Sequence, residues 1–193
     1  LVKGALNCFQ REGPLPSGLA IFLRTDAPPG SGLGSSSTMV ATLVGVFSQW
    51  LRRPLTAYEI AELTYRIERV DLRIAGGRQD QYAAVFGGFN FIEFRAGQTV
   101  VNPLRLHPDT VNELEVSLLL CYTGRTRLSA HIVEKQAQAY IEGRPEVVAS
   151  LDEMKRLTLE MKALLLRDRL REFGEKLHEA WGWKKQLQSE ITS

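Results

Sequence analysis

The sequence has 193 residues and a mass of 21.6 kDa, with 44% hydrophobic and 24% charged residues. This balance is that of an ordinary globular protein, and it excludes a wholly disordered chain. The net charge of +2 and the pI of about 8.6 are too mild for a dedicated nucleic-acid-binding protein. The two cysteines, Cys8 and Cys121, lie far apart, which excludes a disulfide framework and a zinc knuckle.

No stretch of the sequence is long and apolar enough to cross a bilayer. The most apolar part, residues 38–51, is too short for a hydrocarbon core about 30 Å thick. Because it is internal, it is not the core of a signal peptide either. We therefore predict a cytoplasmic protein with neither a membrane nor a nucleic-acid partner. The chain starts at Leu1 without an initiator methionine and stops directly after a helical run, so we expect a piece of a larger protein.

The first part of the chain predicts a short helix or irregular entry over residues 1–17, followed by a strand, a loop and a helix. Residues 19–24 are an apolar run between turn signals, which is typical of a buried strand. Residues 26–37 have the composition of a loop. From Thr38 the apolar residues recur with a helical period until Arg52-Arg53-Pro54 ends the helix.

A second helix is predicted from the residues that would cap it. Thr56 and Glu59 have the spacing of a capping box, in which each side chain accepts from the backbone amide of the other residue. The apolar stripe of this helix consists of Ile60, Leu63, Ile67 and Val70. Gly76-Gly77 interrupts the pattern, and a further helix is predicted from Gln79 to Val85.

The second half of the chain predicts strands and then helices. Apolar or alternating runs predict strands at residues 89–94, 100–106 and 115–122. From Ser129 the pattern is helical, in the segments 131–142, 145–166 and 168–188. The whole order predicts an α+β fold whose helical end opens a second domain.

The most informative segment is the glycine- and serine-rich loop of residues 28–37. Glycines at positions 30, 32 and 34 let the backbone take left-handed conformations and approach a ligand closely. The serines that follow stand in the first turn of a helix, where free N–H groups and the helix dipole favour an anion. The segment has no lysine for a Walker A loop, and it has Ser35 where a dinucleotide fingerprint needs its third glycine. A phosphate is the expected ligand, although a serine-capped helix after a flexible turn is the plain alternative.

Two carboxylates downstream of the loop are candidates for a role in phosphoryl transfer. Phosphoryl transfer needs a metal to neutralise charge and often uses a carboxylate near the acceptor proton. Glu68 lies near the end of its helix, one residue off the apolar stripe, and Asp80 lies where the next helix is predicted to begin. From the residues alone, Glu68 is equally a solvated helix residue and Asp80 an ordinary cap.

The loop resembles the second signature motif of the GHMP kinases, the family of galactokinase, homoserine kinase and mevalonate kinase. The resemblance implies ATP and Mg²⁺ as cofactors, with Ser36 and Glu68 on the metal and Asp80 orienting or deprotonating the acceptor hydroxyl. It also implies that the loop wraps the ATP phosphates through Pro29, Gly30, Ser31, Gly32, Leu33, Gly34, Ser35, Ser36 and Ser37.

Further segments resemble one branch of that family, the kinases that phosphorylate the anomeric hydroxyl of D-glycero-D-manno-heptose 7-phosphate. The segments are Ile67–Arg69, Gly76–Ala84, Phe86–Phe91 and Tyr122–Gly124 with Arg127 and Ser129. The resemblance implies a sugar phosphate as the second small-molecule partner, contacted by Arg78, Thr123 and Arg127. The alternative for Arg78 is a surface salt bridge, and the alternative for Arg127 is a solvent-exposed side chain.

The resemblance also implies a domain plan. Residues 1–110 would be most of the ATP-binding domain, which is similar to ribosomal protein S5 domain 2, and residues 111–193 the start of the C-terminal domain. The first and third family motifs would lie outside the sequence, and the oligomeric state is left open. Two alternatives remain: another GHMP kinase, similar to fucokinase or galactokinase, and a nucleotide- or sugar-binding regulator without turnover.

Overall fold

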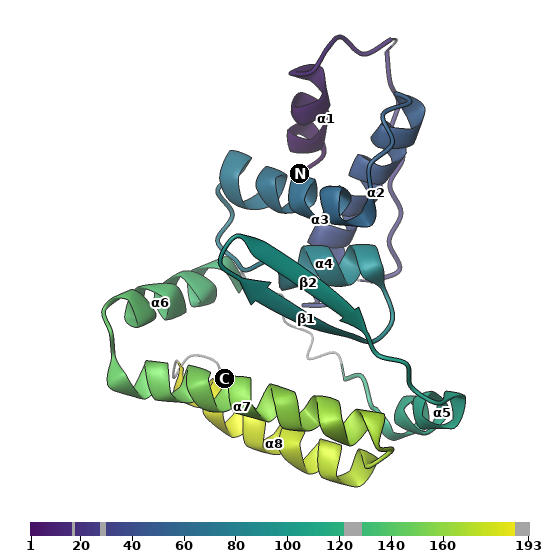
Figure 1. The fold of residues 1–193 in the computed structure, drawn as a ribbon. Coiled ribbons are helices and arrows are strands. Elements are labelled where there is room, and N and C mark those ends of the chain that lie inside the picture. The colour runs from purple at the N-terminus through teal and green to yellow at the C-terminus, as the bar shows by residue number, and fades with distance from the viewer. Residues whose placement is uncertain (17, 28–29, 122–128, 188–193) are drawn as a thin grey trace. The chain divides into compact units, whose positions relative to one another are not determined.

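The computed structural model describes residues 1–16, 18–27, 30–121 and 129–187, with the backbone alone at residues 129–132 (Figure 1). The chain divides into two compact units. The first contains residues Leu1–Gly88, and the second contains residues Phe89–Cys121 and the chain from His131 on. In the described part of the chain, no helix is both long and apolar enough to cross a membrane.

The first unit is a cluster of helices (Figure 1). Its elements in chain order are α1 (Val2–Gln10), α2 (Ser35–Trp50), α3 (Ala57–Tyr65), the π-helix η1 (Arg66–Asp71) and α4 (Gln79–Phe86). Helices α1, α2 and η1 share a core in which Phe9, Val44 and Ile67 are buried. The apolar period predicted from Thr38 is confirmed, and α2 starts slightly earlier, at Ser35.

The predicted capping box is present at the start of α3. The Thr56 side chain accepts a hydrogen bond of 3.3 Å from the Glu59 amide, and the Glu59 carboxylate accepts one of 2.7 Å from the Thr56 amide. Two backbone donors at the helix start are therefore satisfied by side chains, which fixes where α3 begins.

The π-turn of η1 changes which side chains face the core. The amide of Leu72 donates to the carbonyl of Ile67 at 3.0 Å, which adds a residue to the turn. Ile67 and its neighbour Glu68 are both buried, whereas Val70 is 59% exposed. The predicted stripe was therefore right at Ile67 and wrong at Val70, because the wider turn shifts the phase of the helix.

The second unit combines a hairpin with helices. Strands β1 (Asn90–Arg95) and β2 (Gln98–Pro103) pair antiparallel, with Ile92 opposite Val101. The helices are α5 (Pro108–Ser117), α6 (Ser129–Ile141), α7 (Pro145–Leu166) and α8 (Leu170–Gln186). Helices α7 and α8 lie side by side (Figure 1), joined by ion pairs from Arg156 to Glu179 and from Lys176 to Glu160.

Two predicted strands are wrong. Residues 18–25 have no secondary structure, and the side chain of Phe22 is 95% exposed. Residues 115–117 belong to α5 and residues 118–121 have no secondary structure, with Leu119 also 95% exposed. An apolar run becomes a strand only when another strand satisfies its backbone groups, and no described segment pairs with either run.

Candidate functional site

The glycine-rich loop has the backbone that its sequence predicts. Gly30, Gly32 and Gly34 have φ angles of 74°, 78° and 72°, so every second residue from 30 to 34 is left-handed. A Cβ atom at Gly32 or Gly34 would meet nothing within 4 Å, so glycine is favoured there by backbone conformation rather than by lack of space. Pro29 lies outside the described residues.

The loop ends at an uncapped helix N-terminus. The N-cap of α2 is Gly34, no side chain accepts a hydrogen bond from the first-turn amides, and no acidic residue lies in that turn. The Ser31 Oγ atom, in the loop itself, is buried and has no hydrogen-bond partner among the described residues. An N-terminus left without a cap, next to an unpaired hydroxyl, offers donors to an anion.

Glu68 lies at the centre of a hydrogen-bonded cluster that joins three elements. Its side chain, from η1, is 1% exposed. From α2, the Ser36 hydroxyl donates to Oε1 at 3.0 Å and the Ser37 hydroxyl donates to Oε2 at 2.7 Å. From α4, Nε2 of Gln81 donates to Oε2 of Glu68 and, at 3.3 Å, to Oγ of Ser37. A buried carboxylate is tolerated because so many donors replace its lost water.

The two oxygens of Glu68 therefore have different surroundings. Oε2 is bonded to Ser37 and Gln81, whose side chains are 3% and 0% exposed. Oε1 is bonded to Ser36, which is exposed at the start of α2. The carboxylate thus has an inner oxygen held by the protein and an outer oxygen at the end of the glycine loop.

Asp80 is the second residue of α4, where the helix dipole favours a carboxylate. Its side chain is half-buried, and within the described ranges the structure gives its carboxylate no hydrogen-bond or ion-pair partner. Because Gln81 follows Asp80 directly and contacts Glu68, the start of α4 is tied to the carboxylate cluster.

The side chain of Arg78, the N-cap of α4, contacts two residues of α3. Its Nη1 lies 2.9 Å from Oε1 of Glu62, and its guanidinium carbon lies 4.3 Å from the centre of the Tyr65 ring. Thr123 and Arg127, the other two predicted substrate contacts, lie outside the described residues.

The arrangement fits a magnesium ion that is coordinated by protein oxygens on one side and by phosphate oxygens on the other. The Ser36 hydroxyl and the outer Glu68 oxygen are hard oxygen ligands 3.0 Å apart. Mg²⁺ in nucleotide sites is held by one or two carboxylates, with phosphate oxygens and water completing the octahedron. No group of three or more His, Cys, Asp or Glu side chains in the described residues could hold a metal ion by itself. Ser36 and Glu68 are the described residues that could hold such an ion together with phosphate oxygens and water.

Sequence reasoning missed the inward direction of Ser37 and the contact of Gln81. Ser37 was grouped with the phosphate ligands, but in the structure its hydroxyl points to the buried side of Glu68. The one available signal for Gln81 was its position beside Asp80, and sequence spacing alone does not say which way a side chain points.

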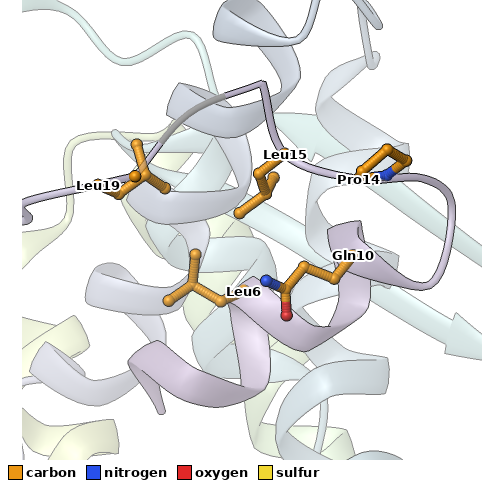
Figure 2. Close-up of a pocket in the computed structure, with 6 residues that line it drawn as sticks. Leu6, Gln10, Pro14, Leu15 and Leu19 are labelled. Atoms are coloured by element: carbon orange, nitrogen blue, oxygen red, sulfur yellow. The ribbon is translucent and has the colours of Figure 1, made fainter.

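A separate pocket of about 480 Å³ lies between α1 and the segment that follows it (Figure 2). Its lining is Leu6, Gln10, Pro14, Leu15, Gly18 and Leu19. None of these described lining residues is a predicted site residue, and none of them carries a charge.

Comparison with known proteins shows similarity to one family of kinases. Residues 1–88 match the model of the GHMP kinases N terminal domain. The D-glycero-alpha-D-manno-heptose 7-phosphate kinase of Campylobacter jejuni is 41% identical over 179 residues, which cover 92% of this chain and 52% of that protein. The L-fucokinase/L-fucose-1-P guanylyltransferase of Bacteroides fragilis is 31% identical over 176 residues, 90% of this chain and 18% of that protein.

A solved structure agrees with these relatives. The crystal structure of a D-glycero-D-manno-heptose 1-phosphate kinase from Bacteroides thetaiotaomicron matches with a TM-score of 0.77 and 39% identity. The match covers 96% of this chain and 54% of that chain.

The fold is that of a GHMP kinase N-terminal domain, which confirms the predicted α+β class. Residues 1–88 are a GHMP kinases N terminal domain by this match, and the chain as a whole is similar to kinases of that family. Within it, the chain is similar to heptose phosphate kinases and spans about half the length of the D-glycero-alpha-D-manno-heptose 7-phosphate kinase of Campylobacter jejuni. The division at residue 110 stays a prediction.

Proposed function

We propose that the complete protein containing this chain is a kinase that transfers the γ-phosphate of ATP to a hydroxyl of a sugar phosphate. The observation that carries the proposal is the contact between Ser36 and Glu68 at the uncapped start of α2. It sets a hydroxyl and a carboxylate oxygen at the end of a left-handed glycine loop, which is the combination that a metal-bound polyphosphate requires. The similarity to kinases named for heptose phosphates supports the substrate class.

The residues divide the work as follows. The loop from Pro29 to Ser35 and the first amides of α2 bind the phosphates, because no side chain among the described residues caps the start of α2. Ser36 and the outer oxygen of Glu68 hold Mg²⁺, which when bound neutralises the charge that develops on the transferring phosphoryl group. Ser37 and Gln81 hold the inner oxygen of Glu68 and so keep the outer one directed at Ser36.

Asp80 acts on the acceptor. The acceptor oxygen forms a bond to the γ-phosphorus, the bond from that phosphorus to the bridging oxygen breaks, and ADP leaves with the electron pair. Asp80 orients the acceptor hydroxyl and takes its proton, a role open to a carboxylate that has no partner of its own among the described residues.

The acceptor is proposed to be the anomeric hydroxyl of D-glycero-D-manno-heptose 7-phosphate. The phosphate group of a sugar phosphate is a dianion and is bound best by basic side chains. The proposed contacts are Arg78, which the structure describes, and Thr123 and Arg127, which lie outside the described residues. Arg78 would have to exchange its ion pair with Glu62 for the substrate, or act while keeping it.

Another sugar acceptor is the second candidate. The relatives from Bacteroides fragilis and Arabidopsis thaliana, at 31% and 30% identity, are named for fucokinase activity. A regulator that binds ATP without turnover is the third candidate, and the presence of Ser36, Glu68 and Asp80 together argues against it, because a sensor does not need the two carboxylates.

The test is phosphate transfer from ATP by the complete protein across a panel of free sugars and sugar phosphates. We expect turnover of the heptose 7-phosphate that falls at least about 100-fold in Asp80→Asn and is unchanged in Asp109→Asn, an exposed aspartate of α5. Turnover confined to fucose or galactose would change the acceptor and keep the kinase. ATP binding without transfer to any acceptor would refute the kinase.

A further inference from the structure

Arg69 makes a set of contacts that neither the family resemblance nor the proposed chemistry assigns. It follows Glu68 in η1, and its side chain is only 11% exposed. Its Nε donates to the carbonyl of Gly77 at 3.1 Å and its Nη1 to the carbonyl of Ile74 at 3.4 Å. Its Nη2 lies 4.0 Å from the inner oxygen of Glu68. One guanidinium thus joins the loop of residues 72–78 to the carboxylate cluster.

The absence of a side chain at Gly76 leaves space for the Arg69 guanidinium. A Cβ atom at this position would lie 2.5 Å from the Arg69 Cζ atom and 2.7 Å from Nη2. The planar guanidinium therefore lies directly against the backbone of Gly76, and any larger residue would push it away. The neighbouring Gly77 is different, because a Cβ atom there would meet nothing within 4 Å.

The loop that Arg69 contacts is followed directly by the start of α4, which carries Asp80. It runs from the end of η1 to the N-cap of α4, and Asp80 is the second residue of α4. On the other side of Asp80, Gln81 is bonded to Glu68. Asp80 is therefore tied to Glu68 from both directions, through Gln81 after it and through the Arg69 contacts before it.

We propose that Arg69, lying against Gly76, is a positioning residue that sets the place of Asp80 relative to the Glu68 metal ligand. The inference rests on the proposed phosphoryl transfer. Arg69 touches neither ATP nor sugar in this account. It acts by holding the carbonyls of residues 74 and 77, and a lysine, with a single point of attachment, would hold them less well than the fork of an arginine.

The experiment uses the complete protein with Arg69→Met, Arg69→Lys, Gly76→Ala and the double variant Arg69→Met/Gly76→Ala. Gly77→Ala and Arg66→Met are the matched controls, the second because Arg66 is an exposed arginine of the same helix. The readouts are kcat, the KM values for both substrates, the thermal midpoint, and amide hydrogen exchange of residues 74–80 without substrate.

We expect Arg69→Met and Gly76→Ala each to lower kcat by about tenfold or more and to leave the KM for ATP within about threefold. The double variant should be no worse than the more damaged single one, because both changes break one contact. Arg69→Lys should recover part of the loss, and residues 74–80 should exchange faster in Arg69→Met and Gly76→Ala but not in the controls.

Three results would overturn the inference: multiplying effects in the double variant, equal damage from Gly77→Ala, or faster exchange with kcat unchanged. Absence of phosphate transfer by the unaltered protein would instead refute the proposed function. In that case the exchange data still decide the contact, because unchanged exchange in Arg69→Met would show that the guanidinium does not hold the loop.

Discussion

The Ser37 hydroxyl donates a hydrogen bond of 2.7 Å to Oε2 of Glu68, and both side chains are buried. Ser36, the residue before it, donates to the other oxygen of the same carboxylate and is exposed. Two neighbouring serines at the start of α2 therefore have different tasks. One supports the fold around a buried charge, and the other belongs to the surface on which we propose that metal and phosphate bind.

This difference predicts that one alanine substitution affects mainly the stability of the fold and the other mainly Mg²⁺ binding. Ser37→Ala leaves the inner side of a buried carboxylate short of a donor, and we expect it to lower the free energy of unfolding by about 1–3 kcal/mol. Ser36→Ala removes the donor to the other oxygen from an exposed side chain, where water can enter the space, so it should lower stability by less than Ser37→Ala does and raise the Mg²⁺ concentration for half-maximal activity at least about tenfold. Denaturant unfolding and a Mg²⁺ titration of activity measure the pair. Equal stability losses would contradict the division of tasks.

Gln81 is predicted to affect metal affinity through Glu68. Gln81→Leu keeps the approximate volume and removes the amide that bonds to Oε2 of Glu68. Outer-shell partners of metal ligands typically contribute about 10–100-fold to metal affinity, so Mg²⁺ binding by calorimetry, with a non-hydrolysable ATP analogue present, should weaken within that range. Gln49→Leu, an exposed position at the other end of α2, is the control and should bind Mg²⁺ like the unaltered protein.

The capping box predicts an acid-sensitive contribution to stability. The Thr56 amide and then the Thr56 hydroxyl lower the pKa of Glu59 in the folded state. A lowered pKa means that the stabilisation is present above the ordinary pKa of the carboxyl group and is lost as the pH falls through the lowered value. Glu59→Gln should therefore be less stable than the unaltered protein at pH 7, and the gap should close in strong acid. A gap that stays constant with pH would contradict this reading.

The two cysteines should differ in reactivity. Burial, and next the charge of Asp71, raises the pKa of the Cys8 thiol in the core under α1, whereas Cys121 is exposed. Since the thiolate is the reactive form, a thiol reagent at neutral pH should modify Cys121 first. Peptide mapping after partial labelling measures this order, with Cys121→Ser expected to abolish the fast phase. Rapid labelling of Cys8 in the folded protein would show that the α1 core is open.

Local signals allowed much of the secondary structure to be predicted. The Thr56 and Glu59 pair marked the start of α3, and Pro145 marked that of α7, because caps and proline act within one helical turn. The strand prediction at residues 115–122 failed because strand formation depends on a partner elsewhere in the chain. The same run of apolar residues favours a strand whether or not that partner is present.

The site was less open to prediction. Family resemblance pointed to Ser36, Glu68 and Asp80, and the structure brings Ser36 to Glu68, but their roles stay predictions. Glu68 was placed beside the apolar stripe, and only the π-turn explains why it is buried with Ile67. The contacts of Arg69 with residues 74 and 77 arise from the path of a loop, which has no periodicity in the sequence.

The most direct measurement is Mn²⁺ binding to the complete protein, followed by electron paramagnetic resonance with a non-hydrolysable ATP analogue present. If Ser36 and Glu68 hold the metal, Glu68→Gln should weaken Mn²⁺ binding by about 100-fold, and Glu62→Gln, a partly exposed carboxylate of α3, should weaken it by less than about threefold. Circular dichroism confirms that each variant is folded. Unchanged Mn²⁺ affinity in a folded Glu68→Gln protein would contradict the account.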